Sequence, residues 1–290
     1  RNGLLYGPFA DRLPNQVLVD WNQPSVYNDF GEPVENLESP WGSAQVVMVY
    51  DSARTPKPPV SMGTLLEWVR SHPGRFTYPA PPDFTGSVFV RQVFYHVSGG
   101  AAIWQNPFDE KRFNLASEET YRTLRELAPS LWRDGKTYPE NPERLSQLLA
   151  DKEVDFAISY HPAEASKKIL DGLYPSTVRT FVFEEGTIGN THFVAIPFNA
   201  AHKEGAMVVA DFLLSPEAQL KKADPDVWGD FPAIDVNRLD SQWRARFAEL
   251  PRGAATLPDE VLQSHRLPEP PSDILIRLEK GWEENVLKKR

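Results

Sequence analysis

The residues best placed for ligand chemistry lie at positions 83–87, Asp-Phe-Thr-Gly-Ser, between an expected strand and the start of an expected helix. Backbone N–H groups at a helix start have no partner within the helix, and the Thr85 and Ser87 hydroxyls add further polar groups. In open α/β sheets, ligands bind at this place, beyond the carboxyl ends of the strands. The simpler interpretation is that Asp83 or Thr85 only caps the helix, and the local sequence slightly favours it.

Two further positions carry the same ambiguity. Tyr160 and His161 directly follow a second expected buried strand, so they occupy a topologically equivalent place, although they could equally form a simple strand exit. Trp41 precedes the first strong strand and stands next to Gly42, which permits close approach of another backbone. An isolated tryptophan is nevertheless more often part of a core than a platform for a ligand.

The chain lacks the motifs of the common catalytic and cofactor sites. Its six histidines form no His-x-His, His-Glu-x-x-His or similar pair with a partner ligand, so zinc catalysis has no local support. The sequence contains no Gly-x-Ser-x-Gly elbow, no phosphate-binding Gly-x4-Gly-Lys-Ser/Thr loop and no calcium loop. Gly186-x-x-Gly189 is too short to predict a dinucleotide site. We therefore expect no metal, no cofactor and no catalytic residue.

Composition narrows the class of protein further. The 290 residues are 41% hydrophobic and 24% charged, which is typical of globular protein and fits one large domain or two of about 150 residues. A net charge of -9 argues against nucleic acid as a partner. No apolar run is long enough for a membrane span. The absence of cysteine excludes disulfides and suits an oxidising compartment. No secretion leader precedes the first residues of the given chain.

Strand and helix signals alternate along the chain. The expected strands are 45–50, 75–78, 154–160, 178–183 and 191–196, with a turn at 185–190. The expected helices are 4–13, one capped by Ser61, one after position 87 ending at Gly99, one opened by Ser117, one opened by Asn141, 162–172, 203–214, one begun by Ser215, 241–250 and 272–287. This alternation predicts an α/β protein with mostly parallel sheets.

The order of these elements resembles that of the extracellular solute-binding proteins of ABC importers. A proline-rich crossover follows the strand at 44–50, and Ser-Met-Gly-Thr-Leu-Leu at 61–66 stands where the family has a Pro-x-Thr-hydroxyl-x-x-Leu helix. A strand-turn-helix at 76–87 and the strand at 154–160 come next. The sequence Ala-Asp-Phe-Leu-Leu-Ser-Pro-Glu-Ala-Gln at 210–219 is similar to the family's tail phrase.

Five phrases resemble one branch of that family more closely, a branch described as a thiamine-type transporter component of Gram-negative bacteria. Together they span nearly the whole chain, and as a set they are more specific than the tail phrase, which indicates only the broad superfamily. They are GLLYGPF at 3–9, ESPWG at 38–42, PPDFTG at 81–86, GTIGN at 186–190 and ADP-x-VWG at 223–229.

The resemblance implies a two-lobed α/β fold of the type II periplasmic binding proteins, with mostly parallel sheets flanked by helices and crossover strands as hinges. It places lobe one at 1–52 and 180–290 and lobe two at 53–179, with hinges near Tyr50-Asp51 and Arg179-Thr180. Family members begin lobe one with strand-helix units that precede the first expected element here. We therefore expect those units, and the ligand contacts that they supply, to be missing from the given chain.

The resemblance also suggests which residues hold a solute, without any catalytic group. Asp83 would compensate a positive charge, His161 is a further candidate for ligand binding, and Gly189 is expected only to form a turn. The candidates for stacking on a flat or cationic solute are Trp41, Tyr78, Phe84 and Tyr160. The candidate donors at the helix start are Thr85, Gly86 and Ser87. The residues expected on the hinge side of the site are Gly186, Thr187 and Asn190.

The function implied by the resemblance is that of a periplasmic receptor, expected to be monomeric, that captures a small solute by hinge closure and delivers it to a membrane permease. The solute would be cationic or aromatic, such as thiamine. An oxyanion or a polyamine in the same fold is one alternative, and iron is disfavoured because the chain has no Tyr-Tyr dipeptide. A transferase or hydrolase that uses Asp83 and His161 is the other alternative, and it would need the two side chains within hydrogen-bond reach.

Overall fold

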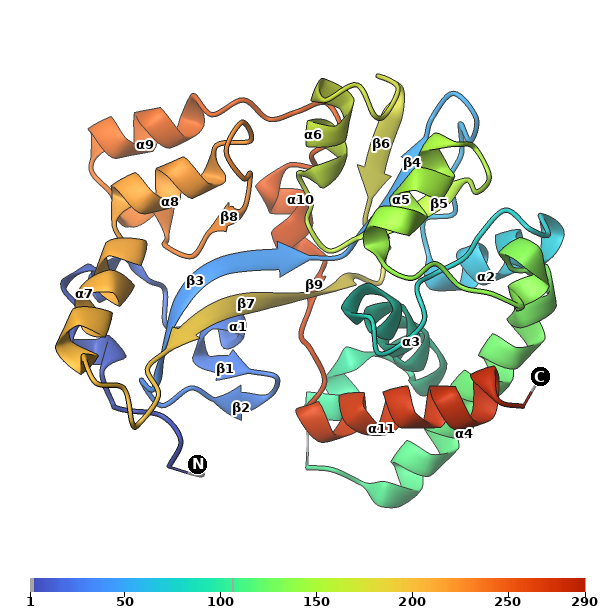
Figure 1. Ribbon diagram of the computed structural model, residues 1–290, viewed down its shortest axis with the longest axis horizontal. Coiled ribbons are helices and arrows are strands. Elements are labelled where there is room, and N and C mark those ends of the chain that lie inside the picture. Colours follow the sequence, from blue (N-terminus) through green and yellow to red (C-terminus); the bar gives the residue numbers. More distant parts are fainter. Residues whose placement is uncertain (1–2, 106, 290) are drawn as a thin grey trace. The chain divides into compact units, whose positions relative to one another are not determined.

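The first strong strand signal in the sequence becomes the middle strand of a three-stranded sheet. The computed structural model describes residues 3–105 and 107–289 (Figure 1). Strand β4 (Val47–Asp51) pairs antiparallel with β5 (Phe156–Ser159) on one side and with β6 (Val178–Phe181) on the other. All residues of β4 except Tyr50 are buried, as its apolar run predicts for a strand covered on both faces.

The prediction of mostly parallel sheets is wrong for the strand pairs of this three-stranded sheet. Because β5 and β6 both run antiparallel to β4, they run parallel to each other, and α6 (Glu164–Leu170) connects them. The chain therefore makes the strand-helix-strand connection that the alternation of signals predicts. Strand β4 lies between the two parallel strands, however, and periodicity along the sequence does not reveal which strands become neighbours.

The chain divides into two units, and two strands run through both of them. Unit 1 ends at Ala44 and then comprises Asn190–Gly253, whereas unit 2 comprises Gln45–Gly189 and continues from Ala254. Strands β3 (Glu38–Gln45) and β7 (Thr187–Ala195) are neighbours in a four-stranded sheet and cross from one unit to the other. These strands therefore form two of the three chain crossings between the units, and the third lies between Gly253 and Ala254.

These boundaries differ from the expected lobes by several residues at each crossover and in the place of residues 254–290. The resemblance implies that this C-terminal segment belongs to lobe one, yet it packs within unit 2. Trp282 is fully buried there and donates its indole N–H to the Tyr78 hydroxyl at 3.1 Å. Packing between segments so far apart in the chain leaves no signal in local periodicity.

Unit 1 is built from short elements around one apolar core. Its further elements are α1 (Pro24–Tyr27), β1 (Asn28–Asp29), β2 (Glu32–Pro33), α7 (Lys203–Leu213), α8 (Pro216–Ala223), β8 (Phe231–Pro232), α9 (Ser241–Ala248) and the 3₁₀ helices Ala10–Arg12, Pro14–Leu18 and Val236–Arg238. Strand β8 pairs antiparallel with β3. The buried core comprises Phe9, Leu13, Val19, Val26, Ile196, Ala210, Leu214, Ile234 and Leu239.

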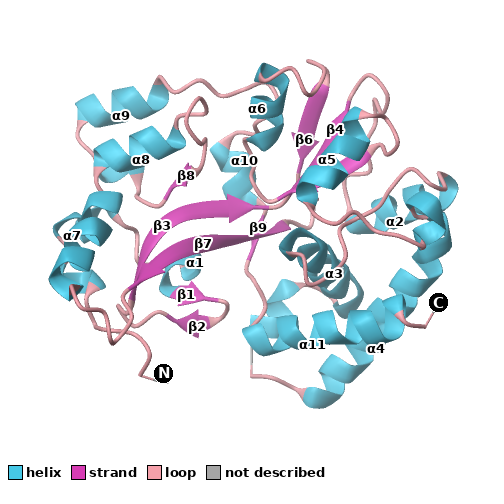
Figure 2. Cartoon of the chain, in the orientation of Figure 1, coloured by secondary structure: helices cyan, strands magenta, loops and turns pink. Residues whose placement is uncertain are grey.

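Unit 2 is mainly helical outside its three-stranded sheet. Its helices α3 (Phe84–Ser98), α4 (Glu110–Leu127) and α11 (Ser272–Trp282) pack against one another (Figure 2). Strand β9 (Arg266–Leu267) pairs in parallel with β7. The remaining elements are α2 (Met62–Ser71), α5 (Pro142–Ala150), α10 (Asp259–Ser264), the 3₁₀ helices Ala101–Gln105, Ala128–Ser130 and Trp132–Gly135, and a π-helical turn at Glu283–Leu287.

Several helices begin and end where the sequence predicts, in particular where a single capping residue precedes an apolar run. Ser61, Asn141 and Ser215 each accept a backbone hydrogen bond as the N-cap of α2, α5 and α8. Gly99 ends α3 in the left-handed conformation, at φ 90°. Among the described helices, none combines the length and apolar character needed to cross a bilayer.

Three predicted elements differ in the structure. The segment expected as a helix at 4–13 instead forms a bridge between Leu5 and Pro197 before its short 3₁₀ turns, because Gly7 and Pro8 interrupt a helix. Residues 75–78 extend without pairing as a strand. Helix α4 begins at Glu110, capped by Asp109, so Ser117 lies inside the helix and not at its start.

A buried ion pair holds α8 to the loop before β8 in unit 1. Lys222 Nζ lies 2.8 Å from Asp230 Oδ2, and the two side chains are 2% and 1% exposed. Lys222 also donates to the Phe231 carbonyl. Burial lowers the pKa of Lys222, and the neighbouring Asp230 carboxylate opposes that shift. A charged lysine in this place therefore depends on its partner.

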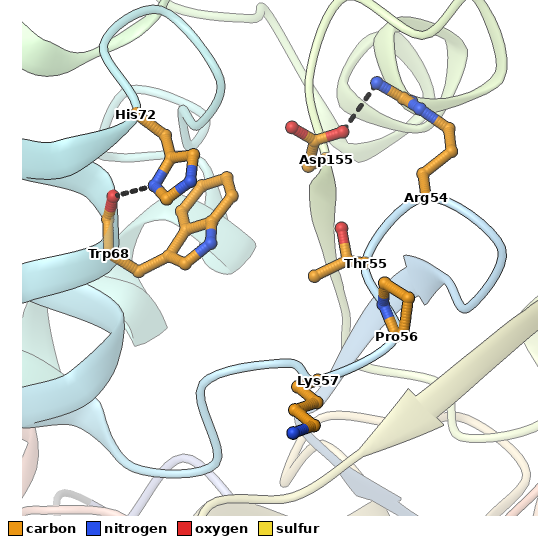
Figure 3. A pocket seen from close by; sticks show the side chains of 7 residues that line it. All are labelled: Arg54, Thr55, Pro56, Lys57, Trp68, His72 and Asp155. Carbon is orange, nitrogen blue, oxygen red and sulfur yellow. Dashed lines mark hydrogen bonds and ion pairs between the residues drawn. The ribbon is translucent and has the colours of Figure 1, made fainter.

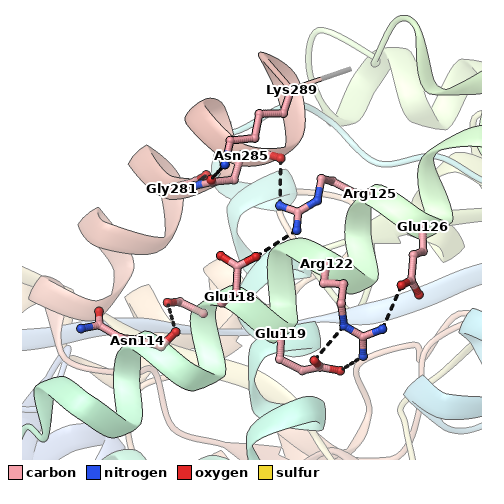
Figure 4. Close-up of polar contacts among 10 residues, drawn as sticks. Asn114, Glu118, Glu119, Arg122, Arg125, Glu126, Gly281, Asn285 and Lys289 are labelled. Atoms are coloured by element: carbon pink, nitrogen blue, oxygen red, sulfur yellow. Dashed lines mark hydrogen bonds and ion pairs between the residues drawn. The ribbon is translucent and has the colours of Figure 1, made fainter.

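We expect Asp230→Ala to lower the free energy of unfolding by about 3–5 kcal/mol, because removing one partner leaves a buried charge uncompensated. Urea unfolding followed by tryptophan fluorescence measures this change. The control is Glu126→Ala in α4, where Glu126 Oε1 lies 2.8 Å from Arg122 Nη1 in an exposed ion-pair network (Figure 4). Solvent screens such pairs, so little change is expected there. Equal losses in the two variants would contradict this account.

Candidate functional site

Asp83 caps α3, as the simpler interpretation of positions 83–87 predicts. Its Oδ1 accepts hydrogen bonds from the backbone N–H groups of Thr85 at 2.9 Å and Gly86 at 3.0 Å. Two of the unpaired donors of the helix start are thereby used. The predicted role of Asp83 toward a cationic solute would therefore fall to its second oxygen.

Gly86 allows the first turn of α3 to lie directly against the chain that precedes it. A Cβ atom at this position would lie 1.9 Å from the carbonyl oxygen of Pro79, a distance that no side chain tolerates. Thr85 and Ser87, on either side, are only 4% and 1% exposed. The glycine therefore has a packing role at the helix start, which fixes the position of its neighbours.

An exposed aromatic ring covers a buried arginine at this helix start. Phe84 is 40% exposed, whereas Arg91, two turns further along α3, is 0% exposed. The Arg91 Cζ atom lies 5.0 Å from the centre of the Phe84 ring, in a cation–π contact. The Tyr160 ring meets Phe84 edge-on, with ring centres 5.0 Å apart. The structure thus brings together two of the four aromatic residues expected to stack on a solute.

Arg91, which the sequence analysis did not identify, forms a buried ion pair with Glu269. Its Nη1 donates to Glu269 Oε2, and the Tyr160 hydroxyl donates to the other carboxylate oxygen, Oε1, at 2.8 Å. Arg91 Nε donates to the Ser87 carbonyl at 3.3 Å, which turns the guanidinium back toward the helix start. An arginine inside the apolar run at 88–94 is the sequence signal that could have identified it.

Burial governs the ionisation of this cluster. It raises the pKa of Glu269, and the Arg91 charge and the hydrogen bond from Tyr160 oppose that shift. Burial also raises the pKa of the Tyr160 hydroxyl, which the Glu269 charge raises further. Arg266 adds a second guanidinium, whose pKa is lowered by burial and raised by Tyr160 and Glu269. Tyr160 is therefore neutral and acts as a hydrogen-bond donor to the carboxylate.

Two polar groups in the first half of α3 have no hydrogen-bond partner within 3–105 and 107–289. They are the Nη2 atom of Arg91 and the hydroxyl oxygen of Ser87, and both atoms are buried. The two residues are four positions apart, so their side chains lie on one face of α3. Buried polar groups without partners are rare in proteins and indicate a place where a ligand or water completes the hydrogen bonds.

Trp41 lies in unit 1, in an aromatic pair that the sequence analysis did not identify. The rings of Trp41 and Trp228 have centres 5.9 Å apart, and Lys222 Nζ lies 5.2 Å from the Trp41 ring. Trp228 is 44% exposed. Trp41 is therefore neither isolated nor wholly core, and its exposed neighbour Trp228 extends the aromatic surface of unit 1.

Tyr78 belongs to the core of unit 2 and not to an open site. Its side chain is 0% exposed and packs against Phe89, Tyr138 and Trp282, with ring centres 4.5, 5.2 and 6.4 Å away. We therefore correct the expectation that Tyr78 stacks on a solute. A tyrosine next to Pro79 gave no sequence signal that distinguished a core ring from a surface ring.

The residues expected near the hinge divide into a turn and a strand. Gly186 makes a turn at φ 98°, where a side chain would meet Leu267 and the backbone of His265. Thr187 is fully buried and accepts a hydrogen bond from Gln45 Nε2 at 3.1 Å, so it is not placed to touch a solute. Asn190 lies in β7 and is partly exposed.

The backbone structure decides two further expectations, those for Gly189 and for His161. The expected turn at 185–190 ends early, because β7 begins at Thr187, so Gly189 lies inside a strand and the turn assigned to it is wrong. His161 follows β5, and its backbone N–H donates to the Ser159 hydroxyl at 3.1 Å. This contact fits the alternative interpretation, in which Tyr160 and His161 only lead the chain out of the strand.

A separate pocket of about 460 Å³ opens in unit 2 and shares no residue with the start of α3. Trp68 and His72 stack on one side of it, with ring centres 4.3 Å apart, and Lys57 lies on another (Figure 3). The Asp155 carboxylate at its wall already pairs with Arg54 at 2.6 Å and with Arg75 at 2.7 Å. Two arginines of the chain itself therefore already neutralise the carboxylate of this pocket.

No group of three or more histidine and acidic side chains suited to a metal ion occurs in the part of the chain that the structure describes. The polar groups at the start of α3 are an arginine, hydroxyls and one paired carboxylate. This donor set suits hydrogen bonding to a small organic or inorganic ligand.

A protein-family model and a relative of known sequence each match most of this chain. Residues 9–248 match the family model of the bacterial extracellular solute-binding proteins. Protein YnjB of Escherichia coli (strain K12) is 40% identical over 263 residues, which cover 90% of this chain and 67% of that protein.

Solved structures share the fold at much lower identity. A periplasmic thiamin binding protein matches with a TM-score of 0.57 and 16% identity, over 98% of this chain and 73% of its own. The periplasmic binding protein AfuA from Actinobacillus pleuropneumoniae, with exogenous fructose-6-phosphate bound, matches with a TM-score of 0.61 and 16% identity, over 99% and 77%. The α/β fold of the type II periplasmic binding proteins, expected from the sequence, is thus confirmed.

We expect Gly86→Ala to lower the free energy of unfolding by about 1–3 kcal/mol, because the new methyl group must displace Pro79 or the first turn of α3. The matched control is Gly205→Ala in α7, where a Cβ atom would meet only His202 at 3.9 Å. That variant should be neutral or up to about 1 kcal/mol more stable, since alanine favours helix. Urea unfolding compares the two, and a neutral Gly86→Ala would refute the close approach.

Proposed function

The chain belongs to the bacterial extracellular solute-binding proteins, and on this premise we propose where and how it holds its solute. Members of the family are solute-binding components of ABC transporters and not enzymes, so the alternative of a transferase or hydrolase using Asp83 and His161 is set aside. They act outside the cytoplasm, with a small solute and a membrane permease as partners.

The proposed solute site is the start of α3 in unit 2. The observation that carries this proposal is the exposed ring of Phe84, which stacks on a buried arginine and meets Tyr160. An aromatic ring held on one face by a guanidinium and left open to solvent on another is a ready platform for a flat solute. In unit 1, the exposed Trp228 beside Trp41 is a second candidate surface for stacking on a flat solute.

A solute with a planar ring fits this platform, and thiamine is the first to test because one neighbour in fold is a periplasmic thiamin binding protein. A polyamine finds less support here, since Asp83 already caps the helix and the nearest buried cation is Arg91. An oxyanion or a phosphorylated solute is the second candidate. The observation that favours it is the unpartnered Nη2 of Arg91.

The remaining parts of the proposal concern how the receptor works. We expect a monomer in the periplasm that binds its solute with a change in the arrangement of the two units by bending at the crossover strands. Binding shifts the equilibrium toward the arrangement in which the solute makes more contacts, and the permease recognises that state. Small-angle scattering with and without solute would detect the change.

Phe84→Ala should weaken binding of the cognate solute about 10- to 100-fold, because it removes the stacking surface. Intrinsic fluorescence titration with thiamine, spermidine, fructose 6-phosphate and sulfate identifies the solute class and then compares the variants. The control is Phe108→Ala in the same unit, since Phe108 is 45% exposed and lies 4.9 Å from an arginine, Arg277.

Two results would count against the proposal. Equal weakening in the Phe84 and Phe108 variants would mean that the start of α3 is not the solute site. Absence of any bound small molecule in native mass spectrometry of the purified protein, together with no response across the panel, would mean that the chain as given does not act as a solute receptor.

A further inference from the structure

We propose that the solute carries an anionic group, a carboxylate or a phosphate, which binds Arg91 Nη2 and the Ser87 hydroxyl at the start of α3. The inference rests on the proposed solute site and names the chemistry of the solute that this site selects. It predicts that an acidic substituent on the solute strengthens recognition in unit 2.

The hydrogen bonds of the Arg91–Glu269 pair are divided in an unusual way. Arginine and carboxylate commonly pair through two parallel hydrogen bonds, which use both carboxylate oxygens. Here Glu269 gives one oxygen to Arg91 Nη1 and the other to the Tyr160 hydroxyl. The Nη2 group of Arg91 is therefore left without an acceptor in the described residues, although its side chain is 0% exposed. Such a group completes its hydrogen bonds when an acceptor ligand binds.

The guanidinium itself favours an anion over a cation. Arg91 is positively charged and its Nη2 group can only donate hydrogen bonds, so it attracts a carboxylate or phosphate and repels a cationic group.

The Ser87 hydroxyl supplies the second contact. Its oxygen is buried and has no hydrogen-bond partner in residues 3–105 and 107–289. Arg91 Nε donates to the carbonyl of the same serine at 3.3 Å, so guanidinium and hydroxyl belong to one turn of α3. A hydroxyl and a guanidinium N–H on one helical turn can each donate to an oxygen of the same anion.

Phe84 connects this anion site to the stacking platform. Its ring lies over the Arg91 guanidinium and is itself open to solvent. Because Arg91 is 0% exposed beneath this ring, the proposal requires the Phe84 side chain to move when the anion binds. A solute with a ring and an acidic substituent could therefore place the ring against Phe84 or Tyr160 and the anion against Arg91.

The test measures thermal stability of the full chain with sodium phosphate and with sodium acetate, each against sodium chloride at equal ionic strength. An anion that binds the native state at ten times its dissociation constant should raise the melting temperature by about 2–5 °C. Two pairs of probes then identify the source of the anion, thiamine against thiamine monophosphate and fructose against fructose 6-phosphate. The anion that raises the melting temperature more, phosphate or acetate, is the one that the site prefers.

Three variants assign the effect to this site. Ser87→Ala should lower the affinity for the stabilising anion about 3- to 10-fold and leave the melting temperature without anion unchanged, because the hydroxyl has no partner to lose. Arg91→Lys keeps the charge but removes the guanidinium, and should abolish the anion response. Arg122→Gln, at an exposed arginine of α4, should respond as the parent protein does.

The outcomes separate this inference from the proposed function. A rise with phosphate or acetate that Ser87→Ala and Arg91→Lys lose supports the anion site. No anion response in the parent protein, or an equal response in all variants, overturns it, even if a vitamin or polyamine from the panel binds and the receptor function stands. Failure of every solute in that panel together with an intact anion response would instead count against the receptor proposal alone.

Discussion

The buried ion pair between Arg91 and Glu269 is the constraint on which the proposed site of unit 2 depends. It joins the middle of α3 to the segment between β9 and α11, and the Tyr160 hydroxyl ties the exit of β5 to the same carboxylate. Three segments distant in the sequence are thereby held around one charge. Removing either partner would leave an uncompensated buried charge, which typically destabilises a protein by about 3–5 kcal/mol.

Backbone contacts fix the same region from the other side. Gly86 lets α3 start directly against Pro79, and Gln92 bonds to the Gly186 carbonyl at 2.9 Å and to the Ile188 N–H at 3.1 Å. Helix α3 is therefore attached both to its own preceding loop and to strand β7, which crosses between the units. A group that binds at the start of α3 is thus held by a helix linked to the crossover strand. This linkage gives a physical route by which a bound solute could influence the crossover.

Local sequence signals predicted what local physics determines. The N-caps Ser61, Asn141 and Asp83 and the buried strand after Gln45 follow from side chains near one another in the chain, and the structure confirms them. Sequence order could not reveal that β4 lies between β5 and β6, or that residues 254–289 pack with unit 2, because both depend on distant contacts.

The same limit applies to the site. Phe84 and Tyr160 were identified from their positions after strands, and the structure brings their rings together. Tyr78 has the same residue type and is core, because its surroundings come from Phe89 and from the C-terminal Trp282. Arg91 and Glu269 are 178 residues apart, and neither is distinguished by a motif. Their burial and their hydrogen bonds distinguish them, and both depend on contacts between distant parts of the chain.

A crystal structure of the protein with its co-purified solute tests the central claim most directly. The account predicts electron density for a small molecule at the start of α3, in contact with Phe84 and with an acidic group within about 3 Å of Arg91 Nη2. Density confined to the separate pocket beside Trp68 and Lys57, or a solute that leaves Phe84 and Arg91 untouched, would contradict it.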